Sequence, residues 1–289
     1  RNHDYANAKT YIDMVLNSGQ YELESDFKYV WSENNKYGKE MIFALLHETG
    51  NNAAEIACHF GPSDHPEVPG RWQYYGVSLP FWRSYDKEDP RREFFYYDYT
   101  GDAKRDDQSD YGFHYMVPEE GVTVVPNDTT KYMQNVATMK YTYDMISDAY
   151  YDGRTICIFR LSDVILCKAE IENNLNGPAA ALPYLNQIRA RAGAPEYGKH
   201  NRFPAPSTKE AMNDAILKER GYELVFEFQR RADLIRFGKY EEVVNAHLKK
   251  LGIAQPTNVT SDLRHFPYPL NDAQLNPNLA AENPSRLPK

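Results

Sequence analysis

The amino-acid sequence predicts a mainly α-helical protein, in which tetratricopeptide-like helix pairs carry a loop-rich subdomain with short strands. Two observations favour helices: apolar residues recur every three or four positions over 4–18 and again over 160–193. A third sets the subdomain apart, because residues 49–130 are rich in Gly, Pro, Asp, Asn and aromatic residues and keep no helical period. We therefore expect a single domain over 1–289, comprising a helical scaffold (1–48 and 155–250), a ligand-facing insertion (49–154) and an extended tail (251–289).

The N-terminal segment predicts one helix and one strand. Over 4–18 the apolar stripe ends at Ser18-Gly19, a sequence that is typical of a helix stop. The run "KEMIFALLHE" (39–48) is short and apolar, which indicates a buried strand.

The stretch "RLSDVILCKAEIENNLNGPAAALPYLNQIRARAG" (160–193) predicts two helices joined by a tight turn at Asn176-Gly177-Pro178. Two helices of this length form an antiparallel hairpin of the tetratricopeptide kind. Because proline lacks a backbone N–H, Pro183 predicts that the second helix begins later than the turn.

A capping box made by Ser207 and Glu210 predicts the start of a further helix. That helix contains the stretch "ERGYELVFEFQRRADLIRFG" (219–238), and another helix is expected over 239–250. The tail is so rich in Pro and Asn that we expect turns and extended chain there.

Composition excludes several classes of function. The net charge is −8 and the basic residues form no block, which argues against a nucleic-acid partner. No apolar run approaches the roughly 20 residues that cross a bilayer. The three cysteines, Cys58, Cys157 and Cys167, lack C-x-x-C spacing and are interpreted as small apolar side chains. The segments "CHFGPSDH" and "RDDQSD" match neither a zinc nor a calcium pattern, so we expect no metal and no cofactor.

Opposite charges alternate along 219–238, and two interpretations compete. In the first, Glu223 and Glu227 act as acid and base in glycoside hydrolysis, which needs two carboxyls facing a cleft. In the second, which we prefer, arginines keep the carboxylates ionised and the charges form partly buried ion pairs between helices. The residues of this expected structural network are Glu219, Glu223, Glu227, Arg230, Asp233 and Arg236, with Arg230 beside Glu227 and Arg236 beside Asp233.

Aromatic residues crowd the interval 68–102, and the whole chain holds 23 Tyr. Pyranose rings stack on Trp or Tyr while their hydroxyls need polar partners at the edge. We therefore predict a platform for a ligand that is partly apolar and partly hydroxylated, and interpret the flanking Phe81, Trp82, Phe94 and Phe95 as core. The predicted ligand-binding residues are Arg71, Trp72, Gln73, Tyr74 and Tyr75.

Seven segments together resemble one known family. They include "YIDMVLNSGQYEL", "WSENNKYGKEMIFAL", "DPRREF", "RLSDVILCKAEIEN", "LNQIRARAG", "ERGYELVFEFQRRADLIRFG" and "FPYPLNDAQLNPNLAAENP". In this order they resemble the SusD/RagB proteins of Bacteroidetes. Trp31 stands where the family usually has an aromatic residue, so the resemblance implies that Trp31 belongs to the core. The sequence departs from the family pattern at Gly221, where arginine is usual, at Phe228, where glycine is usual, and at Arg231, where an aromatic residue is usual.

The resemblance implies a non-catalytic, lipid-anchored glycan-binding protein of the outer-membrane surface, which captures oligosaccharides for a SusC-like TonB-dependent transporter. It also implies that the chain is a processed or truncated piece, because the family's N-terminal helical portion and lipidated cysteine are not found in it. The alternative function is a helical-repeat scaffold that binds a peptide or a partner protein.

Overall fold

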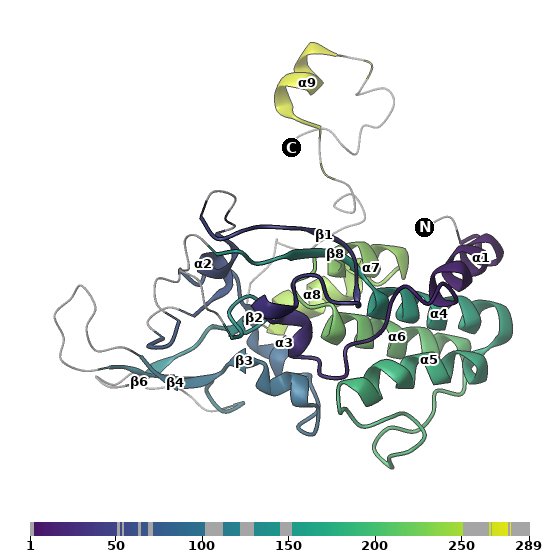
Figure 1. The fold of residues 1–289 in the computed structure, drawn as a ribbon, viewed down its shortest axis with the longest axis horizontal. Helices are drawn as coiled ribbons and strands as arrows, with labels where there is room; N and C mark the ends of the chain where they lie inside the picture. The colour runs from purple at the N-terminus through teal and green to yellow at the C-terminus, as the bar shows by residue number, and fades with distance from the viewer. Residues whose placement is uncertain are drawn as a thin grey trace. The chain divides into compact units, whose positions relative to one another are not determined.

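The computed structural model divides the chain into two compact units, Arg1–Glu227 and Phe228–Lys289, and each is described by itself. Figure 1 traces both. The described residues are 3–50, 53, 55–62, 65–68, 72–101, 112–121, 130–144, 152–250, 266, 268–276 and 278.

Long helices gather at one end of the first unit, and the prediction of a mainly α-helical protein is confirmed. They are α1 (Tyr5–Leu16), α4 (Leu161–Asn176), α5 (Pro178–Arg191) and α6 (Lys209–Glu223). Helix α4 packs against each of the other three (Figure 1). The predicted N-terminal helix begins where the Asp4 side chain accepts a hydrogen bond from the Asn7 N–H, which satisfies one free donor of the first turn.

The α4–α5 pair is the expected helical hairpin, but its second helix does not begin late. Gly177 has φ +88°, a conformation that glycine adopts readily, and Pro178 is already the first residue of α5. Pro183 lies inside α5, so the prediction drawn from it is wrong. The lost hydrogen bond is outweighed by burial, since Leu185 and Ile188 are both fully buried between the helices.

Helix α6 differs from the prediction at both ends. Its N-cap is Thr208, whose hydroxyl accepts from the Ala211 N–H at 3.1 Å, so the expected Ser207 box lies one residue early. The helix ends at Glu223, and the chain then turns through Phe226 and Phe228 at φ +61° and +62°. The stretch 219–238 is therefore not one helix.

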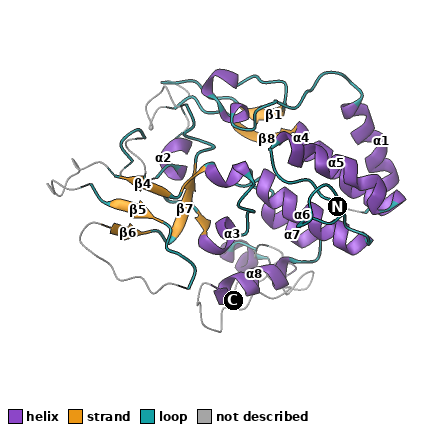
Figure 2. Ribbon diagram, turned by 90° about the horizontal axis from the view of Figure 1, so that it is seen from below, coloured by secondary structure: helices purple, strands orange, loops and turns teal. Residues whose placement is uncertain are grey.

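Short strands form three small sheets, and Figure 2 shows most of them away from the long helices. The strand predicted in 39–48 is β1 (Met41–Leu45), which pairs antiparallel with β8 (Ile156–Arg160). Its predicted burial is wrong, because a two-stranded sheet leaves Phe43 and Leu45 about half exposed, at 55% and 48%. In the second sheet β7 lies between β2 and β3, and in the third β5 lies antiparallel to β4 and parallel to β6. The bounds are β2 (Val77–Ser78), β3 (Phe95–Tyr96), β4 (Asp98–Thr100), β5 (His114–Met116), β6 (Thr130–Tyr132) and β7 (Asn135–Thr138).

Aromatic side chains build the core beneath the insertion. Trp31, Trp82, Phe94 and Phe95 are buried, and Phe81 packs against the cluster that contains Trp82 and Phe95, as the sequence predicts. Short helical turns frame this core: α2 (Ile56–Phe60), α3 (Leu79–Arg83) and the 3-10 turns Tyr29–Trp31, Glu33–Asn35 and Pro90–Glu93.

The cysteines occupy two kinds of surroundings. Cys58 and Cys157 are buried, and burial raises the pKa of the Cys157 thiol, so both act as small apolar side chains. Cys167 is only partly buried, and its Sγ lies 3.7 Å from Asp163 Oδ1 and 3.6 Å from Arg220 Nη1. The prediction of an apolar setting is therefore wrong for Cys167.

The second unit contains α7 (Arg230–Arg236), α8 (Tyr240–Lys250) and α9 (Leu270–Leu275). The helix predicted over 239–250 is α8. The tail was expected to lack helices, and α9 corrects this, because Leu270–Leu275 contains no proline after its N-cap Pro269. Arg231 lies over the Phe266 ring at 4.4 Å, a cation–π contact.

Phe228 has left-handed backbone and is 67% exposed, so its side chain gains little from burial. Left-handed conformation costs about 1–2 kcal/mol for an L-residue. We expect Phe228→Gly to raise the free energy of unfolding by up to about 1 kcal/mol, since glycine's extra chain entropy offsets part of the gain. Urea denaturation measures it.

Phe226→Gly is the matched control for this change. Phe226 has nearly the same φ, but its ring packs on Phe60 at 5.0 Å between centroids. Removing that ring is expected to cost about 3 kcal/mol. A stability loss of similar size in both variants would contradict the explanation by backbone strain.

Candidate functional site

Three carboxylates from α6 and the turn after it are buried inside the first unit. Glu219, Glu223 and Glu227 are at most 3% exposed. Glu219 and Glu223 lie one turn apart on α6, and Glu227 reaches the same interior from the turn, where its N–H donates to the Leu224 carbonyl at 3.0 Å. The three side chains, spaced four residues apart, are therefore buried in the same interior although Glu227 lies beyond the end of α6.

Arg160, the last residue of β8, joins carboxylates from three segments of the chain. Its Nη1 donates to Glu40 Oε1 at 2.6 Å and to Glu223 Oε1 at 2.7 Å. Its Nε and Nη2 donate to the two oxygens of Glu227 at 2.7 and 2.9 Å. A planar guanidinium with five donors can hold several carboxylates at once in this way.

Further arginines complete what we call the buried ion-pair network. Arg91 lies 2.7 Å from Glu219 and 2.9 Å from Glu223, and Arg189 lies 2.7 Å from Glu219. Cations and carboxylates are equal in number, so the network carries no net charge. Its members are Arg91, Lys140, Arg160, Arg189 and Arg191 with Glu40, Asp89, Glu219, Glu223 and Glu227.

Electrostatics keep Glu223 and Glu227 ionised. Burial by itself raises the pKa of Glu223, but Arg191, Arg160 and Arg91 outweigh it and hold that pKa well below the usual range. The pKa of Glu227 is lowered in the same way by Arg160 and Lys140 against burial. A general acid must be protonated near working pH and must reach its substrate. Glu223 and Glu227 do neither, so they cannot serve as the acid and base of a glycosidase.

Lys140 is a cation of the network whose charged form is disfavoured by burial. Burial lowers the pKa of its ammonium to about 8, although Glu227 acts in the opposite direction. The Nζ donates to Glu227 Oε1 at 2.6 Å and lies 4.4 Å from the centre of the Trp31 ring. Lys140 therefore ties the core aromatic residues to the ion pairs.

Arg220, also on α6 in the first unit, lies 2.7 Å from Asp163, and the charges of the 219–238 stretch that follow Glu227 belong to the second unit. Arg236 Nε donates to Asp233 Oδ1 at 2.9 Å, as the spacing of three residues predicts, and Asp233 is buried. Arg230 is the first residue of α7, and its pairing with Glu227 stays a prediction.

Trp72, Tyr74 and Tyr75 are exposed aromatic side chains of the first unit that follow one another closely in the sequence. Trp72 is 36% exposed, Tyr75 54% and Tyr74 65%. The Trp72 and Tyr74 rings lie 5.4 Å apart between centroids, tilted by 35°. Four of the predicted ligand-binding residues are thus near one another at the surface, and Arg71 lies outside the described residues.

Helix α2 holds the segment that carries these rings through two backbone hydrogen bonds. The Trp72 N–H donates to the Cys58 carbonyl at 2.8 Å, and the Tyr75 N–H donates to the His59 carbonyl at 3.1 Å. The His59 ring contacts all three aromatic rings. We call His59, Trp72, Tyr74 and Tyr75 the aromatic cluster. In the sequence, His59 stands out only as part of "CHFGPSDH", a segment considered as a metal site. The available signal for its place among the rings is the adjacent Phe60, whose ring centroid lies 5.1 Å from that of Tyr75.

Gln73 differs from its neighbours in its backbone, which has φ +49°. Its Nε2 donates to Asn135 Oδ1 at 3.1 Å, at the start of β7. This bond connects the aromatic cluster to the central strand of the second sheet.

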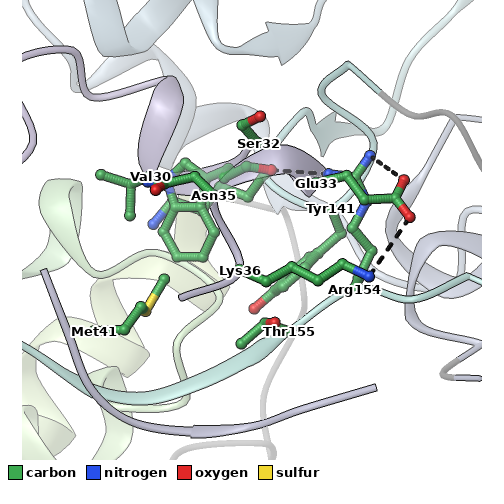
Figure 3. Close-up of a pocket in the computed structure, with 11 residues that line it drawn as sticks. Val30, Ser32, Glu33, Asn35, Lys36, Met41, Tyr141, Arg154 and Thr155 are labelled. Atoms are coloured by element: carbon green, nitrogen blue, oxygen red, sulfur yellow. Dashed lines mark hydrogen bonds and ion pairs between the residues drawn. The ribbon is translucent and has the colours of Figure 1, made fainter. Parts of the chain in front are cut away.

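A small cavity lies beside the core of the first unit. Figure 3 shows Glu33 between Lys36 and Arg154, with its carboxylate 3.9 Å from each cation. The cavity measures about 10 Å³, room for about one water molecule. Trp31 Nε1 and Thr155 Oγ1, in its lining, are buried without a partner among the described residues. The cavity can hold a water but no sugar ring.

A sequence profile of the SusD family matches residues 39–285, which is most of the chain. The chain belongs to the SusD/RagB family. The resemblance read from the seven segments is thereby confirmed.

Relatives of known sequence agree with this assignment. The chain is 39% identical over 120 residues to a SusD-like protein of Formosa agariphila, a match that covers 42% of this chain and 22% of the relative. It is 25% identical over 264 residues to a second SusD-like protein of that organism, covering 84% of this chain and 50% of the relative. The starch-binding protein SusD of Bacteroides thetaiotaomicron is 28% identical over 137 residues, covering 47% of this chain and 22% of the relative.

Solved structures of the SusD superfamily share the fold. A SusD homologue from Bacteroides thetaiotaomicron superposes with a TM-score of 0.71 at 25% identity, over 93% of this chain and 57% of that one. A surface glycan-binding protein from the same organism, solved with laminarihexaose, gives 0.66 at 20% identity, over 94% and 57%. The chain thus spans little more than half the length of its solved relatives. In the part of the chain that the structure describes, no helix has the length and apolar character to cross a bilayer.

Proposed function

We propose that this SusD-family chain is the oligosaccharide-contacting part of a non-catalytic glycan-binding protein of the cell surface. The observation that carries the proposal is the aromatic cluster, in which the exposed residues Trp72, Tyr74 and Tyr75 follow one another on a segment that is hydrogen-bonded to the largely buried helix α2. Flat apolar faces with polar tips suit pyranose rings, which combine C–H patches with hydroxyls.

Polar groups at the edge of the cluster complete the proposed site. Gln73 and Asn135 form an amide pair next to the rings, and side-chain amides are suitable hydrogen-bonding groups for sugar hydroxyls. Arg71 is proposed as an additional residue whose guanidinium donates hydrogen bonds to sugar hydroxyls. Shallow stacking sites of this kind bind with dissociation constants of roughly micromolar to millimolar, about −8 to −4 kcal/mol.

The relatives indicate where such a protein works. One solved relative is a surface glycan-binding protein in complex with laminarihexaose, and a curated relative is the starch-binding protein SusD. We propose a location at the outer-membrane surface, through a lipid anchor of the full-length protein, and delivery of the captured oligosaccharide to a SusC-like TonB-dependent transporter.

The platform makes a direct prediction for binding. In titration calorimetry against a panel of glucans that includes laminarihexaose and starch oligosaccharides, we expect Trp72→Ala and Tyr74→Ala each to weaken binding about tenfold, the value of one lost ring contact. Tyr37→Ala is the matched control, because Tyr37 is 76% exposed and belongs to no part of the cluster. It should leave the affinity unchanged.

Three outcomes would count against the proposal. Unchanged affinity in both cluster variants excludes the platform. Absence of any glycan binding, together with hits from a peptide library, supports a helical-repeat scaffold. Release of reducing ends from a polysaccharide over hours shows catalysis.

A further inference from the structure

His59 occupies the centre of the aromatic cluster. Its ring centroid lies 5.1 Å from that of Trp72, 5.5 Å from Tyr74 and 6.2 Å from Tyr75. The contact with Trp72 is edge-to-face at 69°, and the contact with Tyr74 is tilted by 35°. Both geometries are favourable for aromatic pairs.

The exposed rings gain order from this contact. Trp72, Tyr74 and Tyr75 each face solvent on one side, so their other side is the place where packing can restrict their rotamers. Fixing a free side chain when a ligand binds costs binding free energy, and a site whose rings are already held avoids that cost. His59, anchored on α2 between the fully buried Cys58 and the buried Phe60, is placed to hold them.

The imidazole acts here as a flat ring and not through its buried nitrogen. Its Nδ1 is buried and has no hydrogen-bond partner among the described residues. A phenyl ring at this position would therefore lose no hydrogen bond at that atom, whereas alanine would remove every ring contact and leave a gap beneath Trp72 and Tyr74.

We propose that His59 is the positioning residue of the glycan platform: it holds Trp72 and Tyr74 in their binding arrangement before the sugar arrives and thereby sets the affinity. The inference rests on the proposed function. It assigns to His59 a role through the other rings and not a contact with the sugar.

The first test needs no ligand. The chain has 3 Trp, and Trp31 and Trp82 are buried in the core. In proton–nitrogen correlation spectra, the indole signal that disappears in Trp72→Ala identifies Trp72. We expect His59→Ala to move and broaden that signal while the other two stay in place, and His59→Phe to return it to a single sharp line. An unchanged Trp72 signal in His59→Ala overturns the proposal.

The second test measures binding of laminarihexaose by calorimetry. We expect His59→Ala to weaken binding about tenfold and His59→Phe to stay within about threefold of the parent chain. In a Trp72→Ala, Tyr74→Ala background, His59→Ala should have less than a further twofold effect, because residues that act through one another are not additive. Equal thermal melting of the two His59 variants excludes a general loss of folding.

The outcomes separate the two proposals. If Trp72→Ala weakens binding and His59→Ala does not, the inference is wrong and the platform stands. A full tenfold effect of His59→Ala in the double-variant background means that His59 touches the sugar itself, which also overturns it. If Trp72→Ala and Tyr74→Ala leave the affinity unchanged, or the parent chain binds no glycan, the proposed function fails and the inference falls with it.

Discussion

Replacing Glu223 with alanine is expected to lower the free energy of unfolding of the first unit by about 3–5 kcal/mol. Glu223 is 0% exposed and faces Arg91, Arg160 and Arg191, each of which would lose a buried partner. Truncating one partner of a buried ion pair is costly because the charges left behind are uncompensated. Urea denaturation followed by circular dichroism measures the change.

An exposed ion pair provides the control. Glu22 lies 3.0 Å from Lys39, and both side chains are more than 70% exposed. Surface pairs contribute about 0–1 kcal/mol, so Glu22→Ala should change stability by less than about 1 kcal/mol. A Glu223→Ala variant no less stable than Glu22→Ala would mean that the buried ion-pair network is not formed as described.

Acid is expected to unfold the first unit through the same carboxylates. The pKa values of Glu223 and Glu227 are lowered in the folded protein from an ordinary 4.5, so their contribution to stability is complete above pH 4.5. Below pH 4.5 the unfolded chain takes up protons that the folded protein does not bind. Stability should therefore fall by about 1.4 kcal/mol per pH unit for each carboxyl, until the folded pKa is reached.

Denaturant midpoints measured between pH 7 and pH 2.5 test this slope. In Glu223→Gln one of the two titrating groups is absent, so its curve should be flatter below pH 4.5 while starting from a lower stability at pH 7. A parallel curve for parent and variant would show that other carboxyls control acid unfolding.

The ion-pair network and the aromatic cluster are connected through the core. Phe60 lies beneath Tyr75 and packs on Tyr141 at 4.9 Å, and the Tyr141 hydroxyl donates to the Phe226 carbonyl at 2.8 Å. Phe226 directly precedes Glu227 in the chain. A salt-linked interior thus supports the segment that carries the rings, which is consistent with a preorganised binding surface.

Local sequence was sufficient for the long helices and the strand at 41–45, because apolar period and capping residues act within a few positions. It failed where distant parts of the chain decide. Pro183 lies inside α5 because burial of the helical hairpin stabilises it by more than the hydrogen bond lost at proline costs. Helix α6 ends at Glu223 because the turn that follows places Glu227 against Arg160 and Lys140, which come from other segments of the chain. Phe228, which stands where the family usually has glycine, marks that turn with its positive φ.

By itself the sequence determined the helical class, the three glutamates of the network and the aromatic stretch that faces solvent, since composition and spacing carry this information directly. The family was determined by the resemblance of the seven segments. Only the tertiary structure decided which cations hold the glutamates and which ring lies beneath Trp72. Arg91 and Arg160 are more than 60 positions from Glu223, and His59 is separated from Trp72 by a loop. Such partners are chosen by how the whole chain packs, because charge pairing and ring stacking depend on distances in space and not on spacing along the sequence.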